Sequence, residues 1–516
     1  MKTNTIDLNT LLLGFNYILF AATILFYSFV DLPLVLNNYS LIIYFLLVIQ
    51  MHFFLYYEKR KRDPFILIQV FVLSLFYFPR FMTMFFCYDY GIEQLERMSP
   101  VTSGEINHVL LFIFVANFFI FMGLAMPKNF SRKTLHQPQS RRGKGNPILV
   151  HPLIPATMLG TIIISGIYFI FFAGSGRVSG DVAPSRFMGY LAILFDYYIV
   201  LFIVFTWLLF YRPDRLYELS CGKAVVRKYK AYVKILILLL ILFAVMRVLV
   251  GSRSSVLTIL LSFLFCALAA GETAVKKKYL IYAGVLVLAS AFMFTFATYS
   301  RAMLAMQETK KVNISDYRDA MVDYRYAYES QFDIKTVLVP VFNRTAYLDY
   351  SVDLIRNSAA YGEIVNFAFY AKSLVDAFTP GFDVFDLPMA SNSLRHIYAG
   401  VPLGRNVGSY QSDQFSIYGE YYILFNGWFS LPVFFIVAFI FQTVYSAIRG
   451  RNLFNRLVIR AFIIYIFCQY WLNSYGTDWL ITDSARMGVV LFVMLYAINY
   501  LSMKRVGKRL SVKQPV

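Results

Sequence analysis

Apolar stretches of membrane-spanning length recur along most of this chain. Runs of about 17–25 predominantly apolar residues are long enough to cross the hydrocarbon core of a bilayer as α-helices. We count twelve such runs, at 10–30, 39–56, 65–86, 107–126, 153–174, 190–210, 234–250, 254–270, 279–299, 422–446, 458–475 and 485–502. The pattern predicts an all-α polytopic membrane protein with about twelve transmembrane helices.

One region interrupts this pattern. From Ser300 to Tyr421 polar and aromatic residues are mixed, and a stretch of about 120 residues is far longer than an ordinary connection. Helical spacing of aromatic and apolar residues recurs within 317–328 and 352–378, whereas 379–408 has the Pro, Gly, Asn and Ser content of loops. The sequence therefore predicts three parts: transmembrane helices in 1–299, a large helical loop domain in 300–421, and three more transmembrane helices with a tail in 422–516.

Composition and charge agree with a membrane protein and suggest its orientation. Charged residues make up 15% of the chain, whereas soluble domains carry about a quarter. Lys and Arg favour cytoplasmic connections. With twelve spans, twenty-nine of the 48 basic residues fall on one side, in 59–62, 128–144, 212–234, 276–278, 449–460 and 504–513. Both termini are therefore expected in the cytoplasm of a bacterium and 300–421 in the periplasm. This distribution explains most of the net charge of +19, so no nucleic-acid partner is expected.

Arginines at the outer ends of the predicted helices indicate an anionic ligand. The loop domain carries eleven Lys and Arg, although outward-facing segments normally avoid them. A guanidinium group presents a planar fork of donors that matches phosphate oxygens. We therefore expect a pyrophosphate just above the outer leaflet, near five arginines at membrane depth or at the outer rim: Arg80, Arg247, Arg253, Arg301 and Arg486. The alternative is that each arginine extends to the interface or pairs with a carboxylate such as Asp478 or Asp483.

Two further features have a functional and a plain interpretation. The turn Gly251–Ser255 combines a glycine, an arginine and serine hydroxyls at the start of a predicted helix, where anions bind readily. It can equally be a tight turn whose arginine reaches the interface. The aromatic residues of the loop domain either pack its helices onto the membrane and the helical bundle or stack on sugar rings.

The chain resembles the Wzy-type polymerases of O-antigen and enterobacterial common antigen, which join oligosaccharide repeat units. The resemblance covers about residues 240–500 and rests on five short features: Gly251–Arg253 closing a helical hairpin, Tyr299–Arg301 ending the next span, the loop Thr379–Arg405, the entry Gly419–Gly427 and Asp483–Arg486 opening the last span. These polymerases are similar in fold to the O-antigen ligase, so the resemblance implies a helical membrane core under an outer helical lid.

The implied reaction belongs to polysaccharide biosynthesis for the lipopolysaccharide. A glycan on undecaprenyl pyrophosphate is the donor, and a terminal sugar hydroxyl of another lipid-linked unit is the acceptor. Arginines stabilise the leaving pyrophosphate without a metal or other cofactor. The partners are these lipid-linked oligosaccharides and membrane lipids, and a chain-length-determining membrane protein is a candidate.

The reaction also needs a base for the acceptor hydroxyl. Glu420 is our first choice, with Asp413 and His396 as alternatives. A structural interpretation of Glu420 is an interface carboxylate paired with an arginine. Arg253 and Arg301 are the preferred pyrophosphate ligands. Further candidate contacts to substrate are Arg405, Arg247, Arg486, Arg80, Arg344 and Tyr421.

Two rival functions remain open. A ligase that moves a finished glycan to another acceptor would share the fold and the arginines. A flippase for lipid-linked sugars would line a central cavity between repeat halves with its charges, but this chain shows no matching halves. The large, asymmetric outer domain favours chemistry over transport.

Overall fold

The computed structural model describes a little under half of the chain. The described residues are 5–29, 36–81, 101–133, 264–271, 274–276, 347–378, 416–448, 453–472 and 476–511, with 163, 234–235, 238, 384–385, 387, 389–390 and 393–394. These residues are mostly helical, as the sequence predicted. The structure contains α1 (Leu8–Phe29), α2 (Asn38–Lys61), α3 (Pro64–Val72), the π-helix η1 (Leu73–Tyr77), α6 (Ser103–Lys133), α16 (Tyr347–Arg356), α17 (Ser358–Ile364), α18 (Phe367–Phe378), α20 (Ile417–Leu424), the 3₁₀-helix η4 (Gly427–Ser430), α21 (Leu431–Ala447), α22 (Leu453–Leu472) and α23 (Thr477–Ser511).

Six helical stretches in the described part are long and apolar enough to cross a membrane. They are Leu8–Phe29, Asn38–Lys61, Pro64–Phe81, Ser103–Pro127, Gly427–Ala447 and Leu480–Ala497. Each overlaps one of the twelve predicted runs. The run 458–475 overlaps α22, which is helical but is not one of the six. The other five predicted runs, and most of the predicted loop domain, lie wholly or largely outside the described residues.

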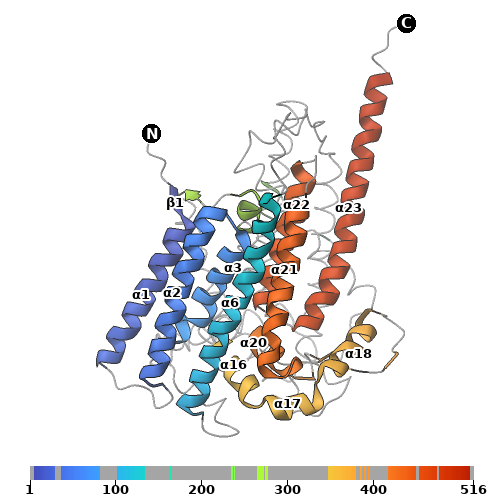
Figure 1. Ribbon diagram of the computed structural model, residues 1–516. Coiled ribbons are helices and arrows are strands. Elements are labelled where there is room, and N and C mark those ends of the chain that lie inside the picture. Colours follow the sequence, from blue (N-terminus) through green and yellow to red (C-terminus); the bar gives the residue numbers. More distant parts are fainter. Residues whose placement is uncertain are drawn as a thin grey trace, which may run out of the picture.

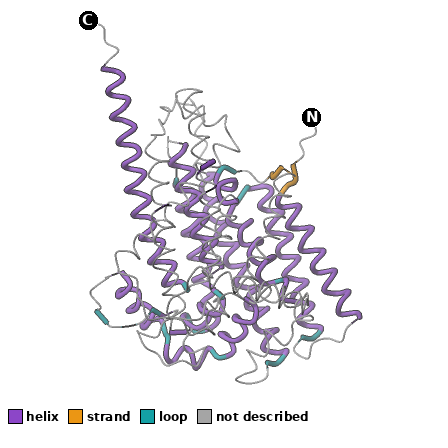
Figure 2. Tube along the Cα trace, turned by 180° about the vertical axis from the view of Figure 1, so that it is seen from behind, coloured by secondary structure: helices purple, strands orange, loops and turns teal. Residues whose placement is uncertain are grey.

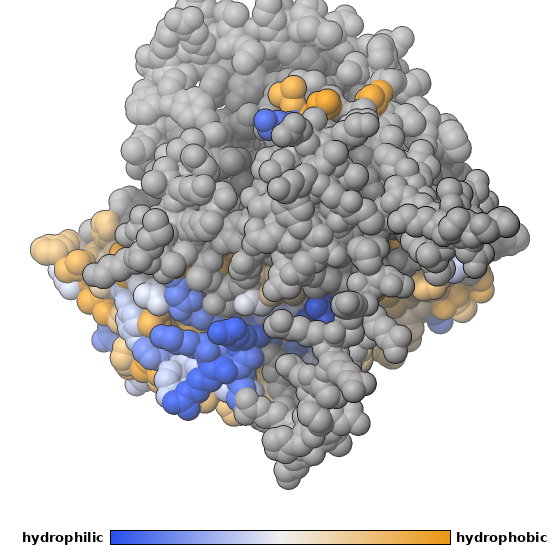
Figure 3. Space-filling model, turned by 90° about the horizontal axis from the view of Figure 1, so that it is seen from above, coloured by the Kyte–Doolittle hydropathy of each residue, from blue (hydrophilic) through white to orange (hydrophobic). Residues whose placement is uncertain are grey.

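The long helices form an antiparallel bundle with distinct ends (Figures 1 and 2). Both chain termini and the turn between α2 and α3 lie at one end, and α16, α17 and α18 lie at the other. A two-stranded antiparallel sheet at the first end pairs β1 (Thr5–Asp7) with β2 (Ala274–Lys276), so Lys276 lies opposite Thr5. Seen from this end, the largest group of hydrophilic side chains among the described residues lies next to apolar surface (Figure 3).

The turn between α2 and α3 follows from its local sequence. α2 ends in the basic residues Lys59–Lys61, which suit the negative end of the helix dipole. Arg62 then takes a left-handed conformation with φ of 53°. Asp63 caps α3 by accepting a hydrogen bond from the N–H of Phe65 at 3.1 Å, and Pro64 occupies the first helical position. Capping and charge together fix this hairpin.

Helices α6 and α21 approach each other closely at a glycine. A Cβ atom on Gly123 of α6 would clash with the carbonyl oxygen of Phe435 and lie 2.9 Å from the Cβ of Ala438, both in α21. Helices in lipid associate through small residues that let their backbones come together. Gly123 therefore explains why these two helices pack tightly.

Candidate functional site

The structure describes four of the predicted site residues. Glu420 and Tyr421 lie on α20, Arg80 follows η1, and Arg486 is a partly exposed residue of α23. The first three lie close to the end of the bundle that carries α16–α18 (Figure 1). The remaining candidates lie outside the described residues: Asp413, His396, Arg253, Arg301, Arg405, Arg247 and Arg344.

Glu420 joins α20 to the first residue of the last helix. Its side chain is 1% exposed. The backbone N–H of Thr477 donates to both carboxylate oxygens, at 3.0 and 3.2 Å, and the Thr477 hydroxyl donates to Oε2 at 2.9 Å. Thr477 begins α23, so the carboxylate meets the positive end of the helix dipole. Glu420 therefore caps α23, a contact that the sequence did not predict.

Aromatic side chains and a second acid surround this cap. Tyr421 is buried, with its ring centroid 5.9 Å from that of Tyr470 in α22. Burial raises the pKa of Tyr370 in α18 and of Tyr421, and the negative charge of Glu420 raises both further. Both phenols therefore stay protonated at neutral pH. Asp478, next to the capped residue, is fully buried as well. At the junction between α20 and α23, two buried carboxylic acids, Glu420 and Asp478, therefore lie near the buried side chains of Tyr370, Tyr421 and Tyr470.

Arg80 forms a buried ion pair with α16, the first helix at the end of the bundle that carries α16–α18. Its Nε lies 2.7 Å from Oδ2 of Asp349 in α16, and both side chains are almost inaccessible to solvent. Burial raises the pKa of Asp349, and the positive charge of Arg80 opposes that effect. The sequence suggested Asp478 or Asp483 as partners for such arginines. Asp349 was missed, because it precedes the predicted helical stretch 352–378, whereas α16 begins at Tyr347.

A π-helix precedes Arg80. In η1 the N–H of Phe78 donates to the carbonyl of Leu73, five residues earlier, at 3.0 Å. Such a π-helical turn shifts the residues that follow it around the helix axis, and it recurs at functional sites. Here it ends at Tyr77, whose hydroxyl lies 3.1 Å from the Ser416 hydroxyl just before α20. The irregular turn thus coincides with the contact between η1, α16 and the start of α20.

Two buried groups of polar side chains lie at this contact and next to it in the long helices. Ser351 of α16 donates to the Ser416 hydroxyl. The Tyr418 hydroxyl donates to Oδ1 of Asn117 in α6 at 2.6 Å, and Gln69 of α3 donates to the same oxygen at 3.0 Å. Buried polar groups need such partners, because an unpaired one costs about 1–3 kcal/mol. The first group joins η1 and α16 at the start of α20, and the second joins α3, α6 and α20.

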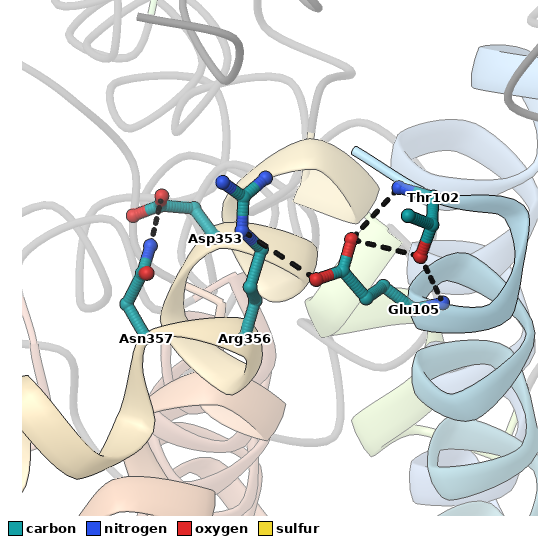
Figure 4. Close-up of polar contacts among 5 residues, drawn as sticks. All are labelled: Thr102, Glu105, Asp353, Arg356 and Asn357. Carbon is teal, nitrogen blue, oxygen red and sulfur yellow. Dashed lines mark hydrogen bonds and ion pairs between the residues drawn. The ribbon is translucent and has the colours of Figure 1, made fainter. Parts of the chain in front are cut away.

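A second polar contact ties α16 to the start of α6 (Figure 4). Nε of Arg356 lies 3.7 Å from Oε1 of Glu105. The other oxygen of Glu105 accepts hydrogen bonds from the backbone and hydroxyl of Thr102, which caps α6. One turn earlier in α16, Asp353 accepts a hydrogen bond from Asn357 at 2.9 Å. Burial raises the pKa of Asp353. Both ends of α16 are therefore anchored to the bundle.

The Gly419–Gly427 segment has a structural role at nearly every position. A Cβ on Gly419 would lie 2.6 Å from the Cβ of Leu354 in α16, so only glycine fits without a shift. The Tyr422 hydroxyl lies 3.2 Å from Nε2 of His108 in α6. Asn426 and Gly427 both take positive φ, 55° and 72°, which turns the chain from α20 into η4 and α21. The segment therefore packs against α16 and α6 and leads the chain from α20 into η4 and α21.

No metal centre is evident in the part of the chain that the structure describes, where no group of three His, Cys, Asp or Glu residues could hold an ion. Compared with family models, curated proteins and solved structures, the chain matches none.

Proposed function

We propose that this protein is a membrane glycosyltransferase that polymerises lipid-linked oligosaccharide repeat units at the outer face of a bacterial inner membrane. The observation that carries the proposal is the buried Glu420 junction, where α20, α23 and the outer helices meet. A carboxylate enclosed at the end of an apolar bundle suits proton transfer from a sugar hydroxyl. The short motifs that resemble Wzy-type polymerases supply the substrate class.

The proposed reaction needs one proton acceptor and a charged binding site. The acceptor hydroxyl attacks the anomeric carbon of the donor sugar, the bond to the pyrophosphate oxygen breaks, and undecaprenyl pyrophosphate leaves. The hydroxyl proton passes to a base, for which Glu420 is the first choice and Asp413 or His396 the alternatives. Arg253 and Arg301 stabilise the charge that develops on the leaving group.

In this proposal the residues around Glu420 position the reacting groups. Arg80 is engaged with Asp349, so we assign it to holding α16 against the spans. The Thr477 donors fix the orientation of the Glu420 carboxylate. Fixed geometry matters because a base acts only within hydrogen-bond reach of the proton it accepts.

The proposed orientation puts the α16–α18 end in the periplasm and both termini in the cytoplasm. The exposed basic residues 59–60 and 62 at the opposite end support it, because cytoplasmic connections are enriched in Lys and Arg. A periplasm-specific reporter inserted after Leu348 should be active, and one at the C-terminus inactive. The reverse pattern would overturn the orientation and with it the proposed reaction.

The pyrophosphate site is tested in cells by the length of the surface glycan. Arg253→Ala and Arg301→Ala should each abolish polymer and leave single repeat units, at normal protein level. Each variant loses charge-assisted hydrogen bonds worth roughly 1.5–3 kcal/mol. Arg→Lys should rescue only in part, because the planar fork is lost.

A matched control is Arg60→Ala, which removes an exposed arginine at the opposite end of the bundle and should leave the glycan ladder intact. A full ladder in both site variants would refute the pyrophosphate site. Loss of all surface glycan, including single units, would instead identify a ligase.

A further inference from the structure

Helix α18 turns an apolar face outward. Phe367, Val375 and Phe378 are 55%, 43% and 48% exposed. At 100° per residue these three side chains and Ala371 fall within about a quarter of the helix circumference. Lys372, also exposed, stands at the edge of this face. We call Phe367, Ala371, Val375 and Phe378 the outward face of α18.

The opposite face of α18 carries its polar residues and is fixed to the protein. Tyr370, Ser373 and Asp376 are all buried. The Asp376 carboxylate accepts hydrogen bonds from the backbone N–H groups of Phe385 and Leu387, each at 2.9 Å. A helix on a water-covered surface has the reverse arrangement, with apolar residues inward. The outward face therefore needs an apolar neighbour.

The surroundings of α18 indicate which neighbour this is. The helix contacts α23 near its first turns (Figure 1). α23 itself exposes Ile481, Val489 and Phe492 on its outer surface, as a lipid-facing span does. At the same end of the bundle, Trp428 and Phe429 in η4 are 39% and 78% exposed. Exposed aromatic residues at the ends of spans typically sit at the membrane–water interface.

Phe367 connects the outward face to this interfacial region. Its ring centroid lies 5.6 Å from that of Phe425, two residues before η4. This aromatic contact joins the outward face of α18 to the segment that leads into η4 and α21, and Lys372 is the charged residue at its edge. A lysine at the edge of an apolar face can extend its ammonium toward lipid phosphates while its stem stays in contact with apolar groups.

We propose that α18 is an interfacial helix, with its outward face immersed at the boundary between lipid headgroups and acyl chains. The occupant of this face is bilayer lipid. An amphipathic helix of this kind lies in the plane of the interface and does not cross the bilayer. This position of α18 marks where the membrane ends on the protein, whether or not the protein carries out the proposed glycosyl transfer.

Spin labels on single cysteines test the proposal in the full-length protein, reconstituted into phosphatidylethanolamine–phosphatidylglycerol vesicles after its native cysteines are replaced. Val375→Cys and Phe378→Cys report on the outward face. Phe492→Cys is the lipid-facing reference, because this α23 side chain is 72% exposed. Glu363→Cys, at an exposed polar position of α17, is the water-facing reference.

Collisions with oxygen, which concentrates in lipid, and with a water-soluble nickel chelate are measured for each label. Labels at 375 and 378 should collide more often with oxygen than with the nickel chelate, as the label at 492 does. The label at 363 should collide more often with the nickel chelate. Nickel dominating at 375 and 378 would place the outward face in water and overturn the proposal. Low collision rates with both reagents would show that protein covers the face, from a second copy or another segment, and would also overturn it.

Discussion

The Glu420→Gln substitution separates a catalytic role of this carboxylate from its role as a helix cap. Gln keeps the shape and one oxygen that can accept the Thr477 N–H, but it removes the charge. Hydrogen bonds to a charged group contribute about 1.5–3 kcal/mol, and a charge at a helix N-terminus contributes about 0.3–1 kcal/mol. Because Glu420 is 1% exposed, these contributions are little screened by solvent. Glu420→Gln should therefore destabilise the protein by roughly 1–3 kcal/mol through the cap alone.

A base has a much larger effect on rate. If Glu420 accepts the hydroxyl proton, Glu420→Gln should lower turnover by about 10²–10⁴-fold. Thr477→Val is the matched control, because it removes the hydroxyl donor at 2.9 Å and leaves the carboxylate in place. It should lower stability by a similar amount, roughly 1.5–3 kcal/mol, yet keep most of the turnover.

Both variants are purified and reconstituted, and polymer formation from lipid-linked repeat units is measured beside the melting temperature. A large loss of turnover in Glu420→Gln alone supports the base. Equal losses of turnover and melting temperature in the two variants would refute it and leave Glu420 as a cap only. Near-normal turnover in Glu420→Gln would move the assignment to Asp413 or His396.

Three further predictions concern the outer end of the bundle. Asp349→Asn leaves the buried Arg80 without its carboxylate and should cost about 3–5 kcal/mol of stability. The double variant Arg80→Met with Asp349→Leu should melt at a clearly higher temperature than Asp349→Asn. Equal melting temperatures of these two variants would contradict the ion pair. Gly419→Ala should destabilise the protein by about 1–3 kcal/mol, because the added Cβ meets a leucine of α16. Gly362→Ala is the control and should not destabilise it, because the space around Gly362 is open. Similar melting temperatures of the two variants would refute the close contact at Gly419. Burial raises the pKa of Asp353, so the folded state holds this proton more tightly than the unfolded state. The free energy of unfolding should then fall as pH rises from about 4 through the raised pKa. Asp353→Asn should flatten this pH dependence in melting measurements. An unchanged pH dependence in Asp353→Asn would refute the role of Asp353.

Local sequence was a good guide to where helices lie and a poorer guide to where they end. The predicted run 39–56 stops where apolar residues stop, but α2 continues to Lys61. Backbone hydrogen bonding does not end at the edge of the hydrocarbon, so basic residues extend the helix. The run 422–446 was predicted as one helix, but the structure interrupts it at Asn426 and Gly427. An Asn-Gly pair favours turns, so the signal was present in the sequence.

The partners in the candidate site could not be predicted in the same way. Glu420 and Thr477 are 57 residues apart in the chain, and Tyr77 and Ser416 are 339 apart. Hydrophobic periodicity reports which face of a helix is apolar, but not which distant helix packs against it. Glu420 could be selected because a carboxylate at the mouth of a predicted span is costly to bury. Its function as a cap required the position of α23.

The polar groups at the outer end explain how this bundle positions α16–α18. Apolar contacts between helices in lipid are weakly directional, because lipid tails are as apolar as the side chains they replace. Hydrogen bonds and ion pairs are satisfied only in one arrangement, and a buried group left unpaired costs about 1–3 kcal/mol. The pairs Arg80–Asp349 and Glu420–Thr477 lie on different helices and converge on α16 and α20. A shift of α16 or α20 would break several pairs at once, so we infer that Glu420 is held in a fixed position, as the proposed glycosyl transfer requires.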